Sequence, residues 1–171
     1  TKEFKLNGRN YGTGTFVVVG HRVPGFRDTL AKLPVETRRE LVSSTTGSTE
    51  SGPDLGSDSL YHIKTPKVVL VGDQPTDANS YGAFAYLLDV RYGIPFTSIR
   101  MEDLSSAELN RYNVIILPDG SEGGYRRALV EAKDELSAWI RGGGVLIGTS
   151  GSAAALADES LGLTEVRLVK A

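Results

Sequence analysis

From Pro66 onward, short apolar runs alternate with segments of helical periodicity, and this alternation limits the possible folds more than any other feature. We expect strands at residues 67–71, 96–99, 113–117, 145–147 and 166–169. Helices are expected between them at residues 79–90, 105–110, 125–141 and 152–157. Continuous apolar character is typical of parallel strands that are covered on both faces. The sequence therefore predicts an α/β fold, a doubly wound three-layer sandwich with a mainly parallel, flavodoxin-like sheet of order 2-1-3-4-5.

Residues 1–60 differ from the core predicted at residues 61–171 and read as an N-terminal appendage. Asn7-Gly8 predicts a hairpin, because both residues tolerate a positive φ. A strand at 15–19 and a helix at 26–41, with a break at Pro34, follow. The appendage contains too little apolar surface to fold alone. We therefore expect it to dock on the core, with the 15–19 strand extending the sheet.

Composition and charge exclude several classes of partner and of functional site. Nineteen basic and 21 acidic residues give a net charge of −2, which offers no broad attraction to nucleic acid or to anionic lipid. The apolar runs are far shorter than the roughly twenty residues of a membrane span. The sequence has no cysteine, so disulfides, thiolate zinc sites and a cysteine nucleophile are excluded. Two isolated histidines match no zinc-ligand spacing, and no phosphate-binding loop follows a strand, so we predict neither metal nor cofactor here.

The segment Gly148-Thr149-Ser150-Gly151-Ser152 lies between a predicted strand and a predicted helix. Such a turn is typical of a nucleophile elbow, which projects one side chain above the start of a helix. A nucleophilic serine needs a base. His62 precedes the first core strand, and His21 reaches the right edge only if the 15–19 strand joins the sheet in parallel. We therefore interpret the segment as a tight turn in which Ser150 caps the helix, with a Ser150–His21 hydrolase as the alternative.

Acidic residues also follow two of the core strands. Asp73 ends the first strand and Asp119 follows the third, while Thr149 and Lys170 end the fourth and fifth. Phosphate-accepting receiver domains have a similar order of residues, but this chain lacks the second acid beside Asp73. Aspartate is also a common turn residue. A small-ligand or phosphoacceptor sensor that uses Asp73 and Asp119 is therefore a second alternative.

Several short runs resemble, in order and spacing, the region that follows the catalytic domain in large multidomain zinc carboxypeptidase-like proteins of bacteria. These runs cover residues 6–18, 52–57, 64–68, 79–82, 88–89, 112–118 and 139–147, and include Asn7-Gly8-Arg9-Asn10-Tyr11 and Trp139-Ile140-Arg141-Gly142-Gly143-Gly144. In those proteins the appended domain looks like a class I glutamine amidotransferase domain. The resemblance spans nearly the whole chain and implies that fold.

The resemblance does not imply the family's chemistry. Amidotransferases use a cysteine at the elbow with a later histidine and glutamate, whereas Ser150 stands here and no histidine follows it. The peptidase's zinc ligands and catalytic glutamate lie in another domain of those proteins, so zinc is expected in the parent's catalytic domain. We therefore predict a non-catalytic accessory or interaction domain whose partner is that catalytic domain or a second copy. The polar loop 43–60 is the expected contact surface, unless it is held on its own domain.

Overall fold

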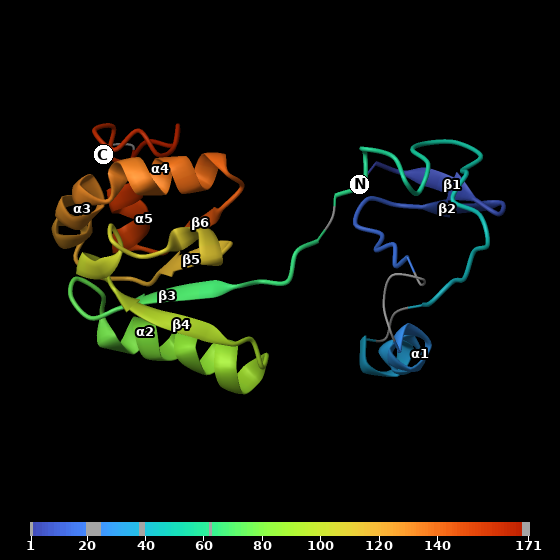
Figure 1. Ribbon diagram of the computed structural model, residues 1–171, viewed down its shortest axis with the longest axis horizontal. Helices are drawn as coiled ribbons and strands as arrows, with labels where there is room; N and C mark the ends of the chain where they lie inside the picture. The colour runs from blue at the N-terminus through green and yellow to red at the C-terminus, as the bar shows by residue number, and fades with distance from the viewer. Residues whose placement is uncertain (1, 20–24, 38–39, 62, 169–171) are drawn as a thin grey trace. The chain divides into compact units, whose positions relative to one another are not determined.

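A computed structural model divides the chain into two compact units, Thr1–Lys64 and Thr65–Ala171. The structure describes residues 2–19, 25–37, 40–61 and 63–168 (Figure 1). The positions of the two units relative to each other are not determined. The docking of the N-terminal part on the core therefore stays a prediction.

The larger unit is built on a parallel sheet. Its strands are β3 (Val68–Gly72), β4 (Phe96–Arg100), β5 (Val114–Leu117) and β6 (Val145–Gly148). They pair in the order β4-β3-β5-β6, and every pair is parallel. The prediction that the first and third core strands are adjacent and central is confirmed, and so is an α/β fold.

Helices cover both faces of this sheet. On one face, α2 (Ala78–Ala85) continues into the wider turns of η2 (Tyr86–Arg91) and packs on Val68, Leu70 and Ile116. On the other face lie α3 (Glu122–Glu131), α4 (Lys133–Arg141) and α5 (Gly151–Leu156). The main core lies beneath these three helices (Figure 1) and includes Val69, Val71, Ile115, Leu117, Tyr125, Leu129, Leu136, Ala155 and Leu161.

Several expected elements differ from the observed ones. The helix expected at 105–110 is replaced by two 3-10 turns, η3 (Met101–Asp103) and η4 (Leu109–Arg111). The helix expected at 125–141 is divided at Ala132. The helix expected from residue 79 begins at Ala78, and Asp77 caps it. Ser80 donates its backbone N–H to the Asp77 side chain at 2.9 Å. Because Asp77 is the cap, the Ser80 hydroxyl is available for another contact.

The fifth strand, expected at 166–169, is wrong over the described residues 166–168, which have no regular secondary structure. The guanidinium of Arg167 donates hydrogen bonds to the carbonyl oxygens of Thr164 and Val166. These bonds hold the segment on itself, and Val166 and Leu168 remain exposed. The sheet therefore has four strands in the described part of the chain.

In the N-terminal unit, β1 (Phe4–Leu6) and β2 (Arg9–Tyr11) form the predicted antiparallel hairpin. Asn7 and Gly8 both have positive φ, 52° and 75°, as such a turn requires. The helix α1 (Phe26–Thr37) continues past Pro34, where a break was expected. Residues 15–19 form no strand, and Thr15 instead closes a turn by donating its N–H to the carbonyl of Gly12.

The loop 43–60 is held on this hairpin. Lys5 donates its backbone N–H to Ser51, and Glu50 donates its own to Lys5, both at 2.8 Å. The carboxylate of Glu50 also accepts the N–H of Gly8 at 2.7 Å and forms an ion pair with Lys5. Since these contacts lie within the unit, they favour the alternative in which the loop is held on its own domain.

Candidate functional site

The carboxyl edge of the sheet is where ligands bind in open parallel folds, most often where the strand order reverses. Here that point lies between β3 and β5, and the loops after these strands bind each other directly. Asp77 donates its N–H to the carbonyl of Asp119 at 2.8 Å, and Ser121 donates to the carbonyl of Pro75 at 3.0 Å. Thr76 and Gly120 form an isolated antiparallel bridge. Backbone from the two loops thus fills the crevice.

Two glycines make this close contact possible. A β-carbon on Gly120 would collide with the carbonyl oxygen of Pro75. A β-carbon on Gly151, in the turn after β6, would collide with the carbonyl oxygen of Gly120. The loops after β3, β5 and β6 are therefore packed backbone against backbone.

The turn after β6 has the shape of a nucleophile elbow. Ser150 has φ 52° and ψ −116°, a combination that non-glycine residues rarely adopt and that concentrates at functional sites. The residue lies between β6 and α5, after Thr149, and is exposed. The sequence pattern therefore located a real structural feature, although the final glycine of the motif is replaced by Ser152.

The carboxylate of Asp119 binds the backbone N–H that a nucleophile elbow normally offers to its substrate. It accepts the N–H of Gly151 at 2.8 Å and the N–H of Gly120 at 2.7 Å. These two bonds, with a smaller contribution from the Ser150 hydroxyl, lower the pKa of Asp119. In an elbow, the N–H after the nucleophile stabilises the oxyanion of the substrate. Here a carboxylate of the protein holds that N–H.

Ser150 does not cap the following helix, so that expectation is wrong: the side chain makes no capping hydrogen bond. The buried Ser152 instead accepts the N–H of Thr149 at 2.8 Å and donates to the carbonyl of Leu117 at 2.7 Å. Sequence reasoning missed this role, and its signal was a small polar residue at the position of the motif's last glycine. Ser152 thereby joins the end of β5 to the turn after β6.

The structure does not bring the other candidate residues into one site. Asp73 has φ 58°, and its carboxylate accepts the N–H of the adjacent Gln74 at 2.8 Å, within its own turn. The hydroxyl of Thr149 is buried without a hydrogen-bond partner in the described part of the chain. His21 and Lys170 lie outside the described residues. Arg100, which ends the neighbouring strand β4 beside Gly72, forms ion pairs with Glu102 and Asp103.

A hydrogen bond between two buried side chains supports the carboxyl edge of the sheet. The hydroxyls of Thr76 and Tyr125 are 2.7 Å apart, and both residues are buried. Burial raises the pKa of Tyr125, which keeps the phenol neutral. Tyr125 packs in the core and, through this bond, also ties α3 to the loop after β3.

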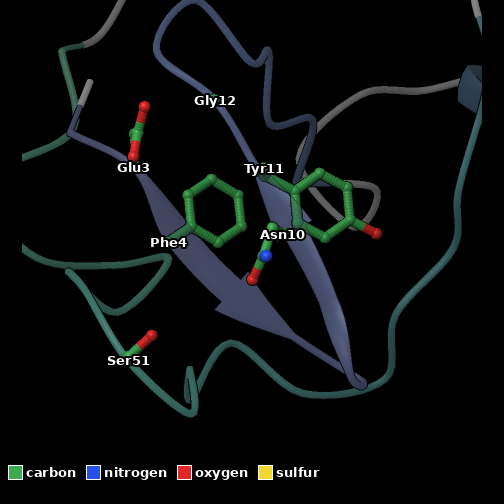
Figure 2. A pocket seen from close by; sticks show the side chains of 6 residues that line it. All are labelled: Glu3, Phe4, Asn10, Tyr11, Gly12 and Ser51. Carbon is green, nitrogen blue, oxygen red and sulfur yellow. The ribbon is translucent and has the colours of Figure 1, made fainter.

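The N-terminal unit has a hollow of its own, lined by residues 3–4, 10–12 and Ser51 (Figure 2). The rings of Phe4 and Tyr11 stack there with centroids 4.9 Å apart, and the guanidinium of Arg9 lies 5.6 Å from the centre of the Tyr11 ring. Arg9 is held in turn by two bonds of 2.6 Å to Glu40. Because its aromatic rings already contact each other and Arg9, this hollow is a structural feature of the hairpin.

Within the described residues, no group of three or more histidine and acidic side chains is arranged to hold a metal ion. The helices in the described part of the chain are all too short or too polar to cross a membrane.

No protein-family model matches the chain, and no solved structure gives a significant match. Among curated proteins, an uncharacterized protein of Clostridium acetobutylicum is 31% identical over 97 residues. Those residues are 57% of this chain and 10% of the Clostridium protein, so the similarity covers only a small part of that relative.

Proposed function

We propose that the larger unit is a catalytically silent module of the class I glutamine amidotransferase fold, serving as an accessory or interaction domain of a zinc carboxypeptidase-like protein. The fold assignment is supported by the parallel order β4-β3-β5-β6 and by an elbow at the position where amidotransferases have their cysteine. Zinc belongs, in this proposal, to the parent's catalytic domain.

The observation that carries the proposal is the bond from Gly151 N–H to the carboxylate of Asp119. An acyl-transfer reaction at Ser150 would place a developing negative charge beside this N–H. Asp119 already holds the donor, and its lowered pKa keeps the carboxylate charged at neutral pH. A second negative charge at the same place would be repelled, so the elbow is blocked by the protein's own side chain.

A serine hydrolase is the second candidate, and the backbone of Ser150 is the observation that favours it. Its φ of 52° is costly for a serine, and such strain is retained mainly where a function or tight packing requires it. The close contact of Gly151 with Gly120 supplies the packing explanation. The hydrolase would also require Asp119 to release Gly151 and His21 to serve as the base.

A fluorophosphonate probe tests the choice between the two. The native chain and the Asp119→Ala variant are incubated with the probe, and modified peptides are mapped by mass spectrometry. We expect Ser150 to stay unlabelled in both, because removing the carboxylate frees the donor but adds no base. Labelling of Ser150 in the native chain that disappears in His21→Ala would overturn the proposal and establish the hydrolase.

A further inference from the structure

The strand β6 is an edge of the described sheet that lacks the usual protection of an edge. It reads Val145-Leu146-Ile147-Gly148, without a charge or a proline, and the side chains of Val145 and Ile147 are 52% and 40% exposed. The opposite edge, β4, carries Thr97, Ser98 and Arg100. Proteins normally keep open edges from pairing by such polar residues. The composition of β6 is therefore that of a strand with a neighbour.

The same chain exposes a segment suited to pair with it. Val166 and Leu168 are 67% and 59% exposed and alternate with Arg167, as in a half-buried strand. Val145 and Ile147 pair with Val114 and Ile116, so they face the side of the sheet that α2 covers. A parallel strand with Val166 beside Val145 would extend this apolar row, with Leu168 beside Ile147.

Charge complementarity fixes the direction and register of this pairing. Arg141 ends α4 shortly before β6, and Glu165 directly precedes Val166. In the described part of the chain neither residue has an ion-pair partner. With Val166 beside Val145, Glu165 lies at the start of the added strand, within reach of the long Arg141 side chain. The antiparallel direction would instead place Glu165 at the far end of β6.

We propose that the chain self-associates, with Val166–Leu168 of a second copy adding to β6 as a parallel fifth strand. The proposal deepens the interaction role proposed above by naming the partner, and rests on that role for its biological meaning. Labelling of Ser150 would overturn the accessory function and leave the association unaffected, so the two can fail separately.

The contacts of the segment before Val166 favour a second copy over the same copy. Leu161 is fully buried in the core beneath α3, α4 and α5. Arg126 forms an ion pair with Asp158 at 3.2 Å, and Lys133 donates to the carbonyl of Ser160 at 2.9 Å. The segment is thus anchored on α3 and α4 of its own copy. Reciprocal exchange between two copies closes a dimer.

Light scattering after size exclusion gives the first test. We expect a concentration-dependent species of twice the 18.3 kDa chain mass. Ile147→Lys and Leu168→Lys should each abolish it, because a lysine on an edge strand opposes pairing. Val90→Lys is the matched control, since Val90 is also apolar and 66% exposed but lies on η2, and should leave the dimer intact. A monomer at every concentration, or a dimer that persists in Leu168→Lys, would overturn the proposal.

Cysteine pairing gives the second test and uses the absence of native cysteine. Neighbouring strands lie about 4.8 Å apart, within the distance that a disulfide spans. Val145→Cys combined with Val166→Cys should form a disulfide-linked dimer on a non-reducing gel. Val90→Cys with Val166→Cys should form none. A disulfide within one chain, or no disulfide in the first variant, contradicts exchange between copies.

Discussion

The carboxylate of Asp119 accepts the backbone N–H of Gly151 at 2.8 Å and thereby ties the loop after β5 to the turn after β6. The same side chain accepts the N–H of Gly120 in its own loop. A third bond links this loop to α2, because Asp119 donates its backbone N–H to the Ser80 hydroxyl at 2.9 Å. One aspartate thus connects three segments at the carboxyl edge.

We expect this contact to make the stability of the larger unit depend on acid pH. The pKa of Asp119 is lowered in the folded protein, chiefly by the N–H of Gly151 and then by that of Gly120. The stabilisation is therefore present above the unfolded-state pKa of about 4 and is lost as the pH falls through the lower folded-state pKa. Asp119→Asn should reduce the loss of stability between neutral pH and about pH 2, measured by urea unfolding.

Glu131→Gln is the matched control for charge, because Glu131 is exposed on α3 and no hydrogen bond or ion pair of its side chain is described. It should leave the pH profile unchanged. Part of the profile should survive even in Asp119→Asn, because the pKa of Asp158 is also lowered, chiefly by hydrogen bonds from Ser160. If Asp119→Asn has the same profile as the native protein, the Gly151 contact does not contribute in solution.

The hydroxyl pair of Thr76 and Tyr125 should contribute measurably to stability. Tyr125→Phe removes a buried hydrogen bond of 2.7 Å and should lower the free energy of unfolding by about 1 kcal/mol. Thr76→Val should cost less stability in the Tyr125→Phe background than in the native protein, because no Tyr125 hydroxyl is then left without its partner. Denaturant unfolding of the two single variants and the double variant measures the coupling. The exposed Tyr92→Phe is the control, and zero coupling would contradict the link.

The contact between Gly151 and Gly120 predicts a steric effect. Gly151→Ala should destabilise the protein by about 1–3 kcal/mol, because its β-carbon has no space beside the Gly120 carbonyl. Gly82→Ala is the opposite case, since Gly82 lies within α2 and a β-carbon there meets no atom within 4 Å. Alanine in a helix is favoured over glycine by about 0.5–1 kcal/mol, so this variant should be more stable than the native protein. Thermal unfolding of both variants checks the difference in sign.

The sheet could be predicted because each buried strand leaves a local signal in the sequence. Val68–Gly72 and Val114–Leu117 are continuous apolar runs, and the flavodoxin-like strand order 2-1-3-4-5 places them side by side. Residues 15–19 and 166–168 carry the same kind of signal without forming a strand. Apolar character gives the tendency to pair, but the pairing itself depends on a neighbouring strand that periodicity does not reveal.

The candidate site could be predicted only in part, for a related reason. The glycine–serine pattern identified the turn at Ser150, because its positive φ is a local property of the backbone. Nothing in the sequence indicated that Asp119 binds Gly151, 32 residues away. A contact of this kind depends on how far each loop rises above the sheet. The sequence therefore identified Asp119 as a candidate but paired it with Asp73 instead of with the elbow.

The two serines of this turn should respond in opposite directions, and this difference separates a structural turn from a catalytic one. Ser152→Ala removes buried bonds to Thr149 and Leu117 and should cost about 1 kcal/mol. Ser150→Gly removes an exposed hydroxyl and relieves a φ of 52°, a strain of roughly 1–3 kcal/mol that exceeds the added flexibility of glycine. We therefore expect the glycine variant to be more stable than the native protein by about 1 kcal/mol in urea unfolding. If Ser150→Gly is instead less stable than the native protein, the Ser150 hydroxyl is needed to hold the turn, and relief of backbone strain is too small to compensate for its loss.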